Sequence, residues 1–118
     1  MINLGSLVLF AAPYQETVDF YHNGLKLPIH EASPGFTQFD VGATIFAIHP
    51  LTPSTSAIAP NGRLAIHFNV ENIETVLNHL YDQHYVATRP TITTEPWGKE
   101  ASITDPSGYQ LELVEPVP

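Results

Sequence analysis

Hydrophobic positions along the chain predict two helices, each with one apolar side. Apolar residues recur every three or four positions in two segments, as Tyr14, Val18, Tyr21 and Leu25 in the first and as Ile73, Val76, Leu77 and Leu80 in the second. Gly24 stands near the last turn of the first helix, and Asn72 stands where it can cap the second.

Apolar or alternating runs on either side of these helices predict strands. In the first half they are Ile2–Ala11, Ile29–Ala32, Phe36–Val41 and Thr44–His49. In the second half they are Leu64–Val70, the extended stretches His84–Thr88 and Thr91–Thr94 around Pro90, then Ala101–Thr104 and Tyr109–Glu115. A strong turn signal, Asp105-Pro106-Ser107-Gly108, separates the last two.

Each half therefore reads as one strand, one helix and three strands. The helix faces superpose when 59 is added to the residue number, which is half of the 118 residues. A proline-rich stretch, Pro50–Gly62, divides the halves. We predict one domain, residues 1–118, with a first βαβββ module at 1–50, a linker at 51–63 and a second module at 64–118. One helix leaves one face of each sheet uncovered, so two modules must pack together.

Composition narrows the classes of partner. Twelve acidic residues against four basic ones give a net charge of -8, which disfavours nucleic acid and anionic membranes and attracts a cationic ligand. No apolar run reaches the roughly 18 residues that span a bilayer. The chain has no cysteine, which excludes disulfides and thiolate sites and fits the cytoplasmic location that we expect.

Two stretches carry a resemblance to a known family. They are Glu16–Tyr21 with Gly24 and Leu25, and Pro96–Lys99 running into Ile103–Leu113 with its Asp-Pro-Ser-Gly turn and Glu-Leu pair. Together they resemble the vicinal oxygen chelate superfamily of glyoxalases, extradiol dioxygenases and fosfomycin and bleomycin resistance proteins, and the bleomycin-resistance branch most. The resemblance implies an α+β fold in which two βαβββ modules form a cup-shaped, curved mixed sheet, usually in a homodimer.

The same resemblance implies four positions for ligands of a divalent metal ion in the cup. Counted from the motifs, they fall on Ser6, on Phe46 or Ala47, on Ala65 and on Glu112. Phe46 is favoured, with the register open by one residue. Only Glu112 carries a usual metal ligand. We therefore expect no metal cofactor and assign these positions to ligand binding.

Two further residues join this candidate site. Strand alternation places His67 on the same face as Ala65, where it pairs with Glu112 around a ligand or forms a displaced metal site with it. His49 joins that metal site only in the alternative register. Trp97, the only tryptophan, is either an aromatic wall for a flat or cationic ligand or a cover over a strand edge.

Three functions remain open. The leading hypothesis is a metal-free protein that sequesters a small cationic or aromatic molecule in the cup. The first alternative is a lyase, isomerase or dioxygenase with a divalent metal ion held by His67, Glu112 and His49. The second is a dimerisation module whose cup is closed by its own side chains. Whether the chain is an enzyme is left undecided by the sequence.

Overall fold

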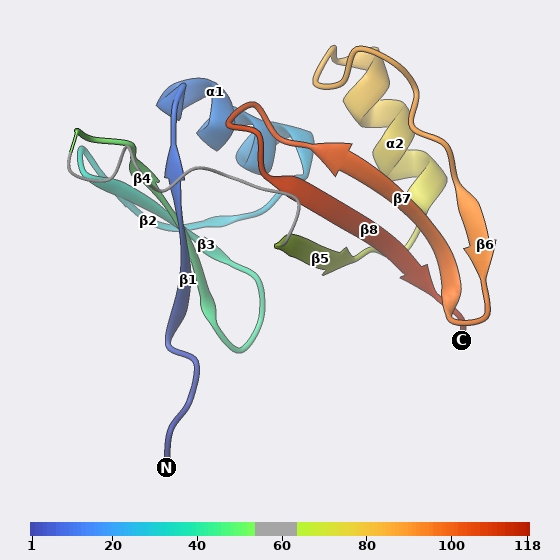
Figure 1. The fold of residues 1–118 in the computed structure, drawn as a ribbon, viewed down its shortest axis with the longest axis horizontal. Helices are drawn as coiled ribbons and strands as arrows, with labels where there is room; N and C mark the ends of the chain where they lie inside the picture. Colours follow the sequence, from blue (N-terminus) through green and yellow to red (C-terminus); the bar gives the residue numbers. More distant parts are fainter. Residues whose placement is uncertain (54–63) are drawn as a thin grey trace. The chain divides into compact units, whose positions relative to one another are not determined.

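The computed structural model describes residues 1–53 and 64–118. The chain divides into two compact units, residues 1–59 and 60–118, which Figure 1 shows as two α+β bodies. The predicted linker, 51–63, lies mostly outside the described residues. Each unit is therefore considered by itself.

The first unit contains a four-stranded mixed sheet. In chain order its elements are β1 (Ser6–Ala11), α1 (Tyr14–Asp19), the π-helical turn η1 (Phe20–Gly24), β2 (Ile29–Ser33), β3 (Phe36–Asp40) and β4 (Ile45–Pro50). The strand order is β1-β4-β3-β2, with β1 parallel to β4 and the other neighbours antiparallel. The predicted order of one strand, one helical segment and three strands is confirmed.

The core of the first unit lies between its helical segment and one side of its sheet. Tyr21 is fully buried, and its ring centroid lies 5.0 Å from that of Phe46. Phe39 pairs with Phe46 across β3 and β4 and is also fully buried. Tyr14 adds a hydrogen bond of 2.8 Å between its hydroxyl and that of Thr37. The helical stripe and the alternating strand positions thus meet in one aromatic core.

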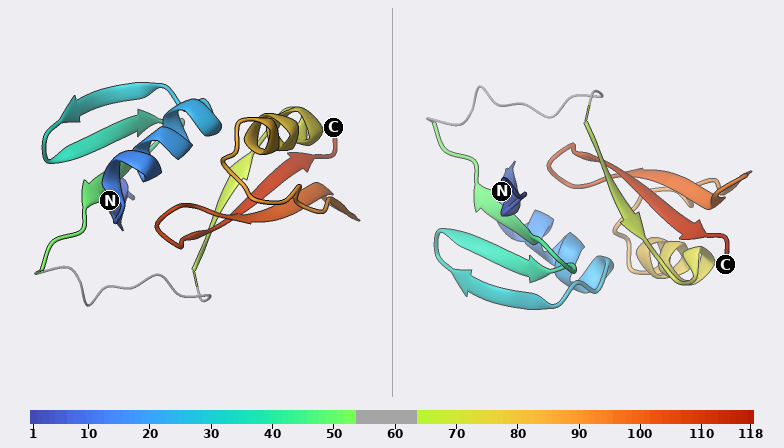
Figure 2. Two further views of the ribbon diagram at one scale, coloured as in Figure 1. Left: turned by 90° about the horizontal axis from the view of Figure 1, so that it is seen from above. Right: turned by 90° about the horizontal axis from the view of Figure 1, so that it is seen from below.

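The second unit repeats this plan. Its elements are β5 (Ala65–Asn69), α2 (Ile73–Asp82), β6 (Thr93–Glu95), β7 (Gly98–Thr104) and β8 (Gln110–Pro116). The strand order is β5-β8-β7-β6, with β5 parallel to β8 and the rest antiparallel. Figure 2 shows each helix on one side of its own sheet. Within the described residues, no helix has both the length and the apolar character that crossing a membrane requires.

Helix α2 is fixed at its start by two side chains. The side chain of Asn72 accepts a hydrogen bond of 3.0 Å from the backbone N–H of Thr75, which confirms the predicted cap. Glu115 on β8 accepts the backbone N–H of Ile73 at 3.0 Å. Ile73, Leu77 and Leu80 are fully buried, as the periodicity predicts. The helix is thus tied to the strand that carries Glu112.

The turn before β8 is clamped by a buried carboxylate. Asp105 is only 4% exposed, and its Oδ1 accepts the backbone N–H groups of Ser107 and Tyr109, both at 2.9 Å. The backbone N–H of Asp105 donates to the carbonyl of Tyr109. This turn sets the register of β7 against β8, in which Ser102 stands opposite Glu112.

One predicted strand is wrong at its start, and one predicted extended stretch is not a strand. β1 begins at Ser6, because residues 2–4 before it lie exposed without a place in the sheet. Residues 84–88 form bends and turns in place of a strand. His84 adopts a φ of 63°, and the N–H of Tyr85 returns to the carbonyl of Leu80. These bonds end α2 and turn the chain, so the strand β6 starts only at Thr93.

Gly98 allows a close approach between two backbone segments of the second unit. Its φ is +146°, and a Cβ at this position would lie 2.1 Å from the carbonyl oxygen of Glu115. Gly98→Ala should therefore lower the free energy of unfolding by more than about 2 kcal/mol, since strain and overlap add. Urea unfolding measures the loss.

Gly35→Ala is the matched control, because a Cβ there meets nothing within 4 Å and its φ is not positive. This substitution should change the free energy of unfolding by about 0.5 kcal/mol or less. Equal losses in the two variants would contradict the close approach at Gly98.

Candidate functional site

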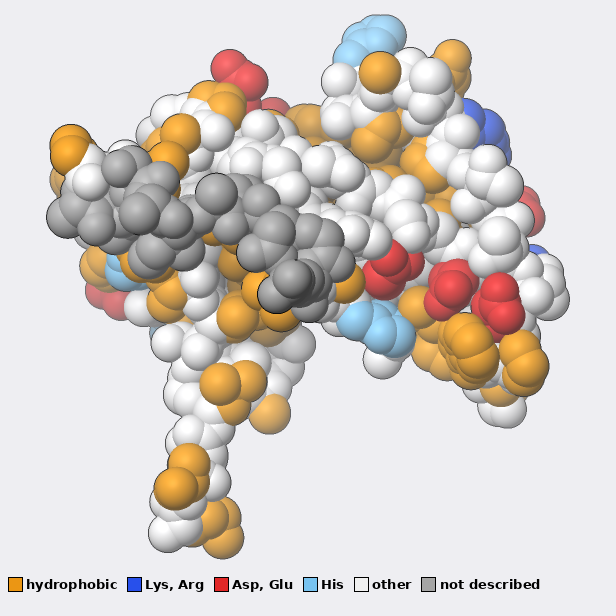
Figure 3. Space-filling model, in the orientation of Figure 1, with side chains coloured by type: hydrophobic (Ala, Val, Ile, Leu, Met, Phe, Trp, Pro, Cys, Tyr) orange, Lys and Arg blue, Asp and Glu red, His pale blue; other side chains and the backbone are white. Residues whose placement is uncertain are grey.

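The side of the second sheet away from α2 is polar. In-register partners share a face, and the partners of Glu112 are His67 on β5 and Ser102 on β7. The alternation of side chains extends this set along each strand. We call it the polar face and define it by His67, Glu95, Glu100, Ser102, Gln110 and Glu112. Figure 3 shows acidic side chains and a histidine gathered beside hydrophobic side chains over this sheet.

Glu112 is held at both carboxylate oxygens. The Ser102 hydroxyl donates to Oε2 at 2.7 Å, and the Gln110 amide donates to Oε1 at 3.0 Å. Each oxygen keeps a further lone pair, because a carboxylate accepts up to about four hydrogen bonds. The side chain is half-buried, so it is oriented by its neighbours and can still contact a ligand.

Trp97 stands in the tight turn between β6 and β7. Its side chain is 53% exposed, and its indole N–H donates to Glu100 Oε2 at 3.0 Å. The hydrogen bond fixes the ring beside a carboxylate of the polar face. An exposed aromatic ring next to a carboxylate is an arrangement that attracts cations.

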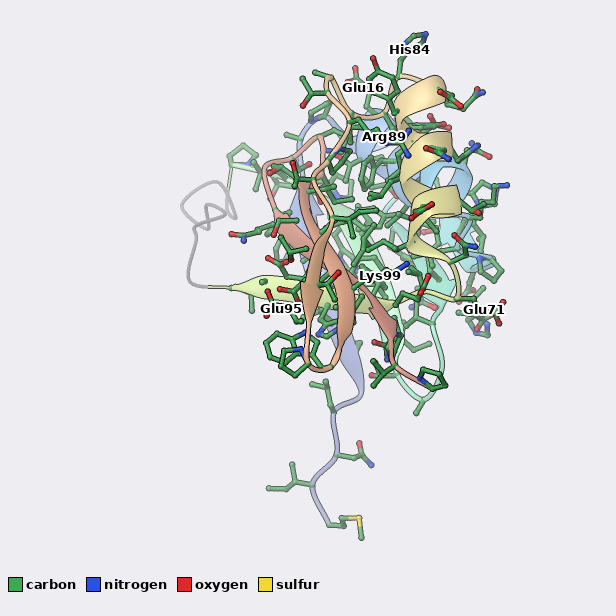
Figure 4. The ribbon with its side chains drawn as sticks, turned by 90° about the vertical axis from the view of Figure 1, so that its right-hand side faces the viewer. Glu16, Glu71, His84, Arg89, Glu95 and Lys99 are labelled. Atoms are coloured by element: carbon green, nitrogen blue, oxygen red, sulfur yellow. The ribbon has the colours of Figure 1, made fainter. Side chains whose placement is uncertain are left out.

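Basic side chains of the second unit lie elsewhere. Lys99 alternates with the polar-face residues of β7, so it lies on the other side of the sheet. Its in-register neighbour on β8 is Glu115. Figure 4 shows Lys99 and Arg89 on the side of α2 and Glu95 on the opposite side. Among the described residues, no Lys or Arg side chain shares the polar face. Within residues 64–118, the carboxylates of this face therefore have no Lys or Arg beside them, and the described part of the face carries negative charge.

A groove of about 330 Å³ adjoins the polar face. Its walls come from the connection after α2 and from β7, and the lining residues are Tyr85, Val86, Ala87, Thr88, Pro90, Ser102, Ile103 and Thr104. Ser102 belongs to both features, because it lines the groove and holds Glu112. The volume is at the lower end of the range typical of small-molecule sites.

The candidate residues of the first unit do not all share a face. Ser6 pairs with Ile45 on β4, which places Phe46 on the opposite side. Phe46 is 2% exposed and packs in the core against Tyr21, so the favoured register is wrong by one residue. Ala47 is the residue on the face of Ser6.

His49 lies on the same face as Ser6, between two aromatic rings. The ring centroids of Phe10 and Phe36 are 5.9 and 6.1 Å from its imidazole. In the second unit, Ala65, His67 and Glu112 lie together on the side away from α2. The indole N–H of Trp97 donates a hydrogen bond to Glu100, which lies on that same side.

The residues present do not fit the divalent metal ion that the resemblance implies. Ala65 and Ala47 offer no ligand atom, and Ser6 is a weak neutral donor. Glu112 is the one usual metal ligand among the four positions, and a single carboxylate does not hold a divalent ion by itself. Within residues 1–53 and 64–118, no three His, Asp or Glu side chains gather in a way that could hold a metal.

Sequence reasoning missed two residues that hold Glu112. Gln110 stands two residues before it on β8, so alternation alone could have found it. Ser102 follows from the turn, because a hairpin closed by Asp105 and Tyr109 places Ser102 opposite Glu112. The groove could not be predicted from the sequence, because residues His84–Thr88 were expected to be extended and not to form a wall beside β7.

Comparison with known proteins agrees with this architecture. A family model described as the Glyoxalase/Bleomycin resistance protein/Dioxygenase superfamily matches residues 3–113. Among curated proteins, none matched the chain.

Solved structures of similar fold cover nearly the whole chain. TnmS3, an antibiotic binding protein from Streptomyces sp. CB03234, is 18% identical over 99% of this chain and 98% of its own, with a TM-score of 0.75. A lactoylglutathione lyase from Agrobacterium tumefaciens is 15% identical over 96% and 92%, with a TM-score of 0.70. At these identities the likeness shows the fold alone.

The side-chain chemistry predicts that the protein retains no stoichiometric divalent ion. After incubation with Zn²⁺, Mn²⁺, Co²⁺ or Ni²⁺ and removal of excess metal, native mass spectrometry should show the mass of the chain alone. An ion retained at one per chain, and lost in Glu112→Gln, would contradict this expectation.

Proposed function

Because the chain belongs to the glyoxalase/bleomycin resistance protein/dioxygenase superfamily, we propose that it binds a small cationic molecule on the polar face without a metal. The observation that carries the proposal is the pair of hydrogen bonds from Ser102 and Gln110 that orient the Glu112 carboxylate. Binding, and not chemical conversion of the ligand, is the function proposed.

The arrangement of charge supports a cationic ligand. Glu112 and Glu100 lie on one side of the sheet, with no basic side chain of the described residues beside them. The exposed indole of Trp97 borders Glu100, and an aromatic ring with a carboxylate binds quaternary or protonated amines. The net charge of -8 adds a weaker, salt-dependent attraction.

The antibiotic binding protein TnmS3 has a similar fold, which is compatible with a binding role on this scaffold. The metal-dependent alternative has less support, since His67 and Glu112 stand opposite each other but no third His, Asp or Glu of the described residues gathers with them. His49, its third residue, lies on the first unit between two phenylalanine rings.

Cation binding is testable with benzyltrimethylammonium, compared with benzyl alcohol and benzoate as neutral and anionic probes. Only the cation should bind, and isothermal titration should show weaker binding as salt rises. Glu112→Gln should weaken the cation at least about tenfold, the effect of losing a contact to a charged group.

Glu71→Gln is the matched control, because it removes the same charge from an exposed position before α2. Its affinity for the cation should stay within about twofold of the parent protein's, since exposed charges are screened. Equal binding of the three probes, or equal losses in both variants, would overturn the proposal.

We propose that the modules predicted at 1–50 and 64–118 act in a homodimer. One helix covers one side of each sheet, and Val8, Phe10 and Ile45 on the uncovered side of the first sheet remain partly exposed. Burying such apolar surface stabilises an assembly. Light scattering should give a mass of about twice 13.0 kDa, whereas the mass of one chain at micromolar concentration would contradict the dimer.

A further inference from the structure

The groove beside the polar face lies along the part of β7 that the edge strand β6 does not reach. In the first unit, β2 pairs with β3 along nearly its whole length, from Phe36 to Phe39. In the second unit, β6 reaches only Gly98–Glu100 of β7. Residues 101–104 of β7 therefore have no strand partner on that side among the described residues. The groove occupies this gap.

The connection after α2 borders the gap without closing it. Residues 85–88 and 90 supply one wall of the groove, but in the described part of the chain no backbone hydrogen bond joins residues 86–90 to residues 101–104. An open strand edge presents backbone donors and acceptors that a further extended segment can pair with.

The turn identifies which backbone groups face the gap. The N–H of Asp105 donates to Tyr109 on the β8 side, and backbone groups point to alternate sides at successive residues of an antiparallel strand. The N–H and C=O groups of Ser102 and Thr104 therefore point away from β8. Both residues line the groove, so it holds two donors and two acceptors on one edge.

The other wall is uncharged. It consists of the apolar residues Val86, Ala87 and Pro90 and the neutral polar residues Tyr85 and Thr88. No acidic or basic residue lines the groove. A charged group placed there would lose water without a partner of opposite charge. The groove thus differs in chemistry from the polar face, although Ser102 contributes to both.

We propose that the groove binds an uncharged, extended amide arm of the ligand, which adds to β7 as a short strand by pairing with Ser102 and Thr104. The proposal rests on the proposed function in that the cationic end of the same ligand lies on the polar face. The groove volume of about 330 Å³ suits a small molecule with one or two amide units.

The test uses N-acetyl-alanyl-alanine N-methylamide as an uncharged probe, followed by ¹⁵N–¹H NMR of the full chain. The probe should bind with roughly millimolar affinity, as expected for a ligand this small. The largest shifts should appear at the amides of Ser102 and Thr104. The ester analogue, in which oxygen replaces the central N–H, should bind at least fivefold more weakly. Equal binding of amide and ester, or shifts elsewhere, would overturn the proposal.

Two variants separate this proposal from cation binding. Ala87 lines the groove from an exposed position, so Ala87→Trp should fill the groove and abolish the NMR shifts caused by the amide probe. The affinity of this variant for benzyltrimethylammonium should stay within twofold of the parent protein's. Ala87→Ser is the control and should change neither the shifts nor that affinity. Glu112→Gln should weaken the binding of the cation and leave the affinity for the amide probe within twofold of the parent protein's. Amide binding that persists in Ala87→Trp would refute the groove proposal alone, and an unchanged cation affinity in Glu112→Gln would refute the proposed function alone.

A protein strand is the alternative occupant. If an uncharged ten-residue extended peptide bound more than a hundredfold more tightly than the blocked dipeptide, the edge would serve a protein partner and the small-molecule proposal would be wrong. Similar affinities for the two would support the small ligand.

Discussion

The alternation of side chains across a sheet covered on one side is the constraint from which the rest of this structure follows. One helix per four-stranded sheet buries every second residue and leaves the others on the opposite face. In the second unit, Leu111 and Leu113 are fully buried against the helix side, while Glu112 between them faces away. Core and candidate site are therefore two sides of the same strand, and each fixes the position of the other.

The sequence predicted the architecture well because long, strongly periodic patterns encode it. The stripe Ile73, Leu77 and Leu80 is buried as expected, and the family membership expected from the motifs is shown by the match over residues 3–113. The prediction failed where backbone geometry, and not hydrophobicity, decides the path. Helix α2 ends at Asp82, and the positive φ of His84 turns the chain two residues later. The residues that follow form one wall of a groove in place of a strand.

The candidate site was predicted only in part, for a related physical reason. Placing Glu112 and His67 on one face needs only a period of two, which the sequence carries. Choosing between Phe46 and Ala47 needs the register of two parallel strands, and a slip of one residue exchanges core and surface. The hydrogen bond from Ser102 to Glu112 joins residues on separate strands. Predicting it requires knowing which two residues close the turn between β7 and β8, and the turn signal alone does not specify them.

The carboxylate of Asp105 has a consequence for how this chain can vary. By accepting two backbone N–H groups within the turn, it fixes the number of residues between β7 and β8. Surface loops commonly tolerate insertions, but one added residue here would rotate β8 by half a period. Glu112 would then face α2, and its leucine neighbours would face water. The length of this connection is thus coupled to the face of the sheet on which Glu112 lies.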